Sequence, residues 1–157
     1  MSNKLPKFLD NHKICIICEG NEEYEYLKRL KDLRVWHKQY DILLENAADK
    51  VIMFGNPCTM QIISKHWTDE NLKSPAKPVN AHLIKEYTGV ENYKGRADQI
   101  QEVMKHVTEE NYIDMRQRVM SLESDDSVTG SSNFGRFLNL FESDDCGWIE
   151  KINEQIE

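Results

Sequence analysis

An apolar run that ends at an acid and a glycine constrains this chain more than any other feature. Residues 13–18 read Lys-Ile-Cys-Ile-Ile-Cys, and they are followed by Glu19, Gly20 and a charged helical pattern. Such a run is typical of a strand that is covered on both faces. Gly20 permits a tight turn. Glu19 is therefore predicted at the carboxyl end of a strand, where open α/β sheets place their ligands.

The sequence leaves two interpretations of Glu19 open. A carboxylate at the end of a strand suits a divalent cation or general-base chemistry. It is equally explained as a solvated charge in the loop after the strand, which is the more common situation in proteins. The residue type and its position do not decide between the two.

The overall composition excludes some classes of protein. The 157 residues suit one domain, or one domain with a small lobe. The net charge of -7 argues against non-specific binding to nucleic acid. It does not exclude a local basic face on the protein. No apolar stretch approaches the roughly 20 residues needed to cross a bilayer, and residues 1–12 lack the apolar centre of a signal peptide. We expect a cytoplasmic protein without a membrane partner.

The cysteines and histidines do not have the spacing of a metal site. Cys15 and Cys18 are three residues apart within the apolar run, so on a strand they point to opposite faces. The other two cysteines are isolated, and the five histidines form no pair at helical spacing. Reduced thiols and no zinc site are expected.

The pattern of the chain changes after Trp67. Before that residue, strand-like runs at Tyr40–Leu44 and Val51–Phe54 alternate with helical patterns, one of which begins at Asn56-Pro57. After it the apolar residues recur only at helical spacing. We therefore predict an α/β fold, with a small Rossmann-like parallel sheet followed by a helical C-terminal part. The expected divisions are residues 1–67, a linker at 68–80 that contains Lys73-Ser-Pro-Ala-Lys-Pro, and a helical part at 81–157.

Apolar stripes predict which residues form the core of these helices. The stripes comprise Tyr26, Leu27, Leu30 and Leu33; Ile100, Val103, Met104 and Val107; Tyr112, Met115, Val119 and Leu122; Phe134, Phe137, Leu138 and Phe141; and Trp148, Ile149, Ile152 and Ile156. The phenylalanine stripe could also bind a partner protein. A core position is the more common role of such a stripe, because surfaces seldom tolerate large apolar patches.

A short loop combines one aromatic residue with two cations. Tyr93, Lys94 and Arg96 lie within the run Asn92-Tyr-Lys-Gly-Arg. An aromatic ring can stack on a base while nearby cations hold a phosphate. The same residues also suit an ordinary solvated loop. This loop is the predicted nucleic-acid contact of the chain.

Two short motifs resemble a known family. The run Cys18-Glu-Gly-Asn-Glu-Glu-Tyr-Glu-Tyr is similar to the first strand, loop and helix of RloB-like proteins, which belong to the TOPRIM superfamily. Glu19, Gly20, Glu23 and Tyr26 match the positions of that motif. Gly55-Asn-Pro-Cys resembles the second marker of the same family, and the two markers occur in the family's order.

The resemblance implies a TOPRIM-like sheet and magnesium-dependent hydrolysis of phosphodiester bonds in DNA or RNA. It assigns Glu19 the role of metal ligand and catalytic residue, with Glu23 assisting and Mg²⁺ or Mn²⁺ as the cofactor. The ion would neutralise phosphate charge and activate water. Relatives of this kind act in bacterial defence against phage, often together with an ATPase, so nucleic acid and an ATPase are the implied partners.

The sequence departs from the family at one place. TOPRIM nucleases carry a D-x-D pair at the end of a later strand, where two carboxylates reach one cation. No such pair follows an apolar strand here, and the segment Leu44–Val51 stands where the acidic unit is expected. Two functions therefore remain: a TOPRIM-type nuclease, or a non-catalytic TOPRIM-like module that binds a partner protein or nucleic acid. A structural domain in which Glu19 is only a charge at a strand end is the third interpretation.

Overall fold

The computed structural model describes residues 14–18, 20–36, 40–44 and 55–142, and for the two strands and Leu140 it describes the backbone only. Along these residues the elements are β1 (Ile14–Cys18), α1 (Asn21–Asp32), β2 (Tyr40–Leu44), α2 (Met60–Ile63), the 3-10 helix η2 (Ser64–His66), α3 (Lys77–Thr88), α4 (Ala97–Met104), α5 (Glu109–Met120) and α6 (Phe134–Phe141). None of the helices in this part of the chain is long and apolar enough to cross a membrane.

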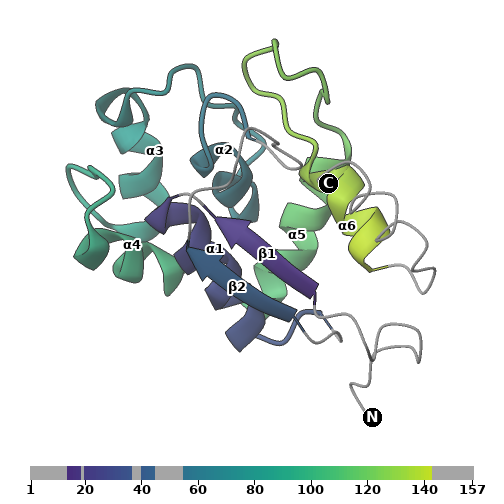
Figure 1. Ribbon diagram of the computed structural model, residues 1–157. Coiled ribbons are helices and arrows are strands. Elements are labelled where there is room, and N and C mark those ends of the chain that lie inside the picture. The colour runs from purple at the N-terminus through teal and green to yellow at the C-terminus, as the bar shows by residue number, and fades with distance from the viewer. Residues whose placement is uncertain (1–13, 19, 37–39, 45–54, 143–157) are drawn as a thin grey trace, which may run out of the picture.

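The strands make up a small part of the described molecule. β1 and β2 pair in parallel, with Ile14 opposite Tyr40 and Cys18 opposite Leu44. Figure 1 shows the pair lying side by side next to α1, with α3 and α4 on one side of that helix and α5 and α6 on the other. Most of the described fold is therefore built by helices that pack on each other.

The predicted fold class is wrong. A Rossmann-like sheet needs several parallel strands with helices on both faces, but the described residues are mostly helical and contain no larger sheet than the β1–β2 pair. The third expected strand, Val51–Phe54, lies outside the described residues. The apolar stripes of the described helices are buried in one common core cluster, and α1 packs on both strands.

The core forms where the helical stripes predicted it. The buried apolar residues include Leu30 of α1, Ile63 of α2, Val103 of α4, Met115 of α5 and Leu138 of α6. They belong to one continuous cluster that joins α1 and α2 to the helices that follow residue 76. The phenylalanine stripe of α6 lies in this cluster, with Phe134 and Phe141 buried and Phe137 partly buried, which confirms its predicted core role.

Two helices begin at residues other than those expected. α3 starts at Lys77, inside the segment predicted as a linker, and it ends before Gly89, which caps it in the left-handed conformation with φ of 74°. Asn56 and Pro57 do not begin a helix, because α2 starts at Met60. The final predicted helix, with Trp148, lies outside the described residues.

Candidate functional site

The start of α1 positions the acids that the first motif predicts. Glu22 and Glu23 occupy the first turn of this helix, where negative charge is favoured by the unpaired backbone N–H groups. Tyr26, Leu27 and Leu30 on the apolar side of the helix are buried. Their packing in the core fixes the position of the helix and therefore of its first turn. Glu19, the predicted metal ligand, lies outside the described residues.

Glu23 is the predicted catalytic residue that the structure does describe, and its carboxylate is held by the second motif. Thr59 Oγ1 donates a hydrogen bond to Glu23 Oε1 at 2.5 Å, and Thr59 comes directly after Gly55-Asn-Pro-Cys. The other carboxylate oxygen, Oε2, is buried and has no hydrogen-bond partner among the described residues. The structure therefore brings the residue that follows the second motif into contact with an acid of the first motif.

Glu22 is bound by residues from two other segments. Tyr93 donates its hydroxyl hydrogen to Glu22 Oε2, and the ammonium group of Lys77 lies 3.3 Å from the same oxygen. The Lys77 Nζ also sits 5.5 Å from the centre of the Tyr93 ring. The side chain of Glu22 is only 11% exposed, while that of Lys77 is 40% exposed. Glu22 is thus a fixed, largely neutralised acid beside Glu23.

The three residues of the predicted nucleic-acid contact lie in different surroundings. Tyr93 is 2% exposed, so its ring belongs to the buried acidic site. Lys94 is exposed, and its backbone N–H donates to Gln99. Arg96 caps the start of α4 and lies 3.7 Å from Asp98. The structure brings Tyr93 to the acids of α1 and leaves the two cations at the surface, and nucleic-acid binding by all three stays a prediction.

Burial and the nearby charge of Glu22 raise the pKa values of two groups at this site, the Tyr93 hydroxyl and the Cys58 thiol. Burial raises the pKa of the Tyr93 hydroxyl, and the charge of Glu22 and the hydrogen bond to it raise that pKa further. Burial also raises the pKa of the Cys58 thiol, and the charge of Glu22 acts in the same direction. Both groups are therefore protonated at neutral pH, and Tyr93 acts as a hydrogen-bond donor.

Sequence reasoning missed three members of this site: Glu22, Thr59 and Lys77. Glu22 precedes Glu23 in the first motif but was not predicted as a site residue, and Lys77 lies in the segment predicted as a linker. They meet through contacts across 36 to 71 residues of chain. The only signal in the sequence was the position of Thr59 next to the second motif.

The described carboxylates do not by themselves form a metal site. No group of three or more His, Cys, Asp or Glu side chains in the described ranges is arranged to hold a metal ion. Glu22 is already engaged by Tyr93 and Lys77, which leaves Glu23 Oε2 as the buried acceptor that is open to a cation. One carboxylate holds Mg²⁺ weakly, because the ion gives up its own waters reluctantly.

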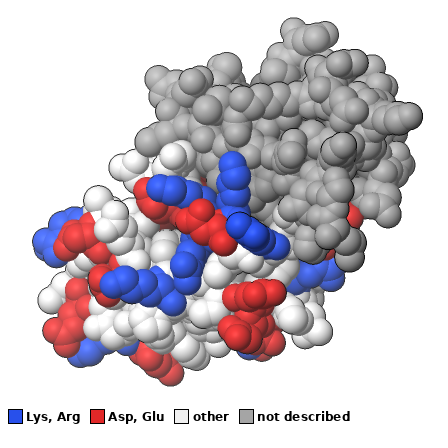
Figure 2. Space-filling model, turned by 90° about the horizontal axis from the view of Figure 1, so that it is seen from below, with Lys and Arg blue, Asp and Glu red and all other residues white. Residues whose placement is uncertain are grey.

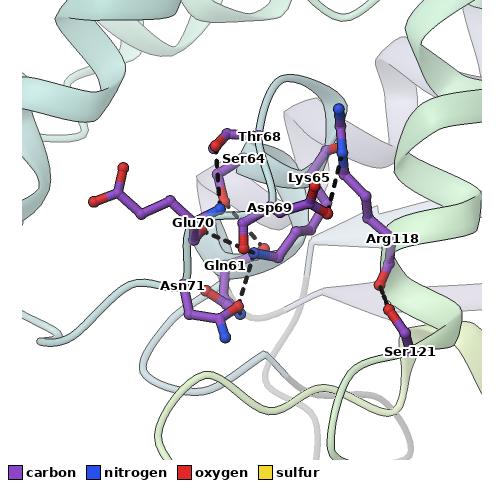
Figure 3. A network of polar contacts seen from close by, with 9 residues as sticks. All are labelled: Gln61, Ser64, Lys65, Thr68, Asp69, Glu70, Asn71, Arg118 and Ser121. Atoms are coloured by element: carbon purple, nitrogen blue, oxygen red, sulfur yellow. Dashed lines mark hydrogen bonds and ion pairs between the residues drawn. The ribbon is translucent and has the colours of Figure 1, made fainter.

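A second polar cluster lies between η2 and the segment that follows it. Lys65 is almost fully buried, and Figure 3 shows its ammonium group pointing toward the carbonyl oxygens of Asp69 and Glu70 and the side chain of Asn71. Arg118 of α5 donates to the Lys65 carbonyl oxygen and lies 3.5 Å from Asp69. A shallow hollow of about 300 Å³ next to it is lined by Asp69, Asp114, Gln117, Arg118 and Ser121. All three N–H donors of Lys65 are used internally, so the cluster is structural.

Positive and negative side chains are mixed on the described part of the face in Figure 2. Lys and Arg side chains are interspersed there with Asp and Glu. An extended basic stripe is the usual mark of a surface that binds nucleic acid by charge alone. The mixed charge of this face agrees with the net charge of -7.

No family model, no curated protein and no solved structure matches this chain. The relation to RloB-like proteins therefore stays a prediction that depends on the two motifs.

Proposed function

We propose that this chain is a nuclease-related protein that acts on the phosphodiester backbone of DNA or RNA at the acidic turn around Glu23. The observation that carries the proposal is the hydrogen bond from Thr59 to Glu23, because it links the first motif to the residue that directly follows the second motif. The Oε2 atom of Glu23 is buried and has no hydrogen-bond partner among the described residues, and this supports a role in binding a cation.

The roles of the residues follow from the resemblance and from their surroundings. Glu19 and Glu23 would hold Mg²⁺ or Mn²⁺, which supplies charge neutralisation at a phosphate and a more acidic bound water. Tyr93 and Lys77 fix Glu22, so that this carboxylate does not turn toward Glu23. Lys77 is the half-exposed cation of the site, and it is suited to contact a phosphate oxygen.

A second function is favoured by a different observation. Glu22 is already neutralised by Lys77, and the sequence lacks a D-x-D pair. Both features suit a non-catalytic module that binds nucleic acid or a partner protein without cleaving it. The two functions differ in one measurable property, which is cleavage that depends on a divalent cation.

The test compares cleavage and binding in the same samples. The full chain is incubated with DNA and with tRNA, with and without Mg²⁺ or Mn²⁺, and binding is measured by fluorescence anisotropy. The nuclease function predicts metal-dependent cleavage that Glu19→Gln and Glu23→Gln abolish. Glu86→Gln serves as the matched control, because Glu86 is an exposed acid on α3. Binding without cleavage would support the non-catalytic module. The absence of both would exclude the nuclease function and the binding of nucleic acid by such a module.

The biological setting follows from the same resemblance. A cytoplasmic role in defence against phage, together with an ATPase partner, is the setting that RloB-like proteins suggest. The absence of a membrane-spanning helix in the described residues is compatible with it. The partner is tested by co-expression with any ATPase that is found to be encoded beside the gene, followed by affinity purification. Separate elution of the two proteins in the presence of ATP would contradict it.

A further inference from the structure

Two residues from different segments determine where the Glu23 carboxylate lies. Thr59 precedes α2, and Gly20 precedes α1. The Thr59 hydroxyl donates to Oε1 of Glu23. Hydrogen bonds to an ionised carboxylate are shorter and stronger than those between neutral groups, so this donor fixes the rotation of the carboxylate.

Gly20 has no side chain, and the Glu23 carboxylate lies in the space that a side chain would occupy. Its φ of -113° and ψ of 153° are extended values that any residue adopts. The turn therefore does not require glycine, contrary to the expectation from the sequence. A Cβ atom at this position would lie 2.2 Å from Glu23 Oε2 and 3.1 Å from Glu23 Cδ. The glycine of the first motif is needed because the carboxylate approaches the backbone there.

We propose that Thr59 is a positioning residue for Glu23 and that Gly20 provides the space in which the carboxylate is held. This inference rests on the proposed function of Glu23 as a cation-binding acid. It gives the second motif a specific task, because Thr59 follows Gly55-Asn-Pro-Cys directly. Asn56 attaches the segment before Thr59 to the loop that precedes α6. Its side chain donates to the Asp126 carbonyl oxygen, and its backbone pairs with Gly130 and Ser131.

The test measures cation binding separately from catalysis. The binding of Mn²⁺ alone is followed by electron paramagnetic resonance in the wild type and in Thr59→Val, Thr59→Ser and Gly20→Ala. Loss of a partner that orients a metal ligand weakens metal binding by about 10-fold or more. We expect this loss in Thr59→Val and in Gly20→Ala. Thr59→Ser keeps the hydroxyl group and should bind Mn²⁺ like the wild type.

The controls separate positioning from packing. Thr88→Val removes the hydroxyl of a buried threonine, which donates to the Ile84 carbonyl oxygen on α3, and it should leave Mn²⁺ binding unchanged. Gly20→Ala introduces no backbone strain, and its one close contact is the end of a flexible side chain. It therefore still tests the proposal if Thr59→Val fails to fold. Circular dichroism confirms the fold of each variant.

The outcomes distinguish this inference from the proposed function. A wild type that neither binds Mn²⁺ nor cleaves nucleic acid would overturn the proposed function and the positioning role together. A wild type that binds Mn²⁺, with Thr59→Val and Gly20→Ala binding equally well, would overturn the positioning role alone. A Thr59→Ser variant as weak as Thr59→Val would show that packing, and not the hydrogen bond, is what matters.

Discussion

His66 is a buried histidine whose two ring nitrogens are both bonded. Its Nδ1 lies 2.7 Å from Asn111 Oδ1 and its Nε2 lies 2.9 Å from the Tyr26 hydroxyl. The Asn111 oxygen also accepts from the Thr108 backbone N–H, and this identifies it as the acceptor. His66 therefore donates from Nδ1 and accepts from Tyr26 at Nε2. Burial is the main reason that the pKa of His66 is lowered to about 4.

Because His66 is neutral in the folded chain, we expect the free energy of unfolding to fall in acid. The unfolded chain takes up a proton near pH 6.5 and the folded chain only near pH 4, so the free energy of unfolding falls as the pH drops through that window. We expect His66 to account for a loss of about 2 kcal/mol between pH 7 and pH 4.5. Urea unfolding at both pH values measures it, and His66→Gln should lose much less.

The exposed His82 provides the control for acid sensitivity. Its side chain is 66% exposed, so His82→Gln should keep the pH dependence of the wild type. An identical loss of stability in the His66→Gln variant would contradict the prediction, since the acid effect would then come from other groups.

Lys65 predicts a pH dependence of the same sign as that of His66, but at alkaline pH. Burial is the largest cause that lowers its pKa to about 8 from an ordinary value of 10.5. Between these values the unfolded chain holds the proton and the folded chain does not, so the free energy of unfolding rises with pH. We expect a gain of about 2 kcal/mol between pH 8 and pH 10 from this group. The gain should be absent in Lys65→Met and retained in Lys85→Met, whose lysine is exposed.

At the scale of elements, Gly135 determines how closely α5 and α6 pack. A Cβ atom at this position would lie 2.9 Å from the Val119 carbonyl oxygen and 3.1 Å from Met120 Cα, and both are backbone atoms that cannot turn aside. We expect Gly135→Ala to lower the free energy of unfolding by about 1–3 kcal/mol, although alanine is the better helix former. Denaturant unfolding measures this change. Asn139→Ala, at an exposed position of the same helix, should have little effect.

The helices could be predicted from the sequence because their signals are local. The stripes of Tyr26, Leu27 and Leu30, and of Tyr112, Met115 and Val119, repeat at helical spacing and are buried as expected. Gly89, which ends α3 in the left-handed conformation, is a local signal of the same kind. The Rossmann-like sheet was wrong because an apolar run shows that a strand is buried but not how many strands will pair with it.

The candidate site depends on contacts that leave no periodic signal. Thr59 reaches Glu23 across 36 residues, and Tyr93 reaches Glu22 across 71. The sequence indicated Glu23 and Tyr93 separately, for different reasons, and gave no indication that they belong to one site. Lys77 was missed because its segment was interpreted as a linker, and proline-rich segments hide the start of a helix that has Pro at its second position.

At the scale of the whole molecule, one buried amide links segments that are distant in sequence. Gln61 of α2 donates to Asn71 Oδ1 and to the Gly130 carbonyl oxygen, and it accepts from the Leu72 N–H. It is fully buried, so each of these bonds replaces one to water. The segment before α3 and the loop before α6 are thereby attached to the same helix, and α5 packs against η2 next to them.

These connections predict that the chain unfolds as one cooperative unit, in spite of the division that its sequence suggests. Ile63 precedes the predicted linker and Leu138 follows it, yet both are fully buried in the same core cluster. Ile63→Val and Leu138→Ala should cost about 1 and about 3 kcal/mol respectively. Each variant should shift the whole transition, so that far-UV circular dichroism and tryptophan fluorescence report the same midpoint. If the two parts were separate domains, each substitution would move only one of two transitions, because a cavity destabilises only the cooperative unit that contains it.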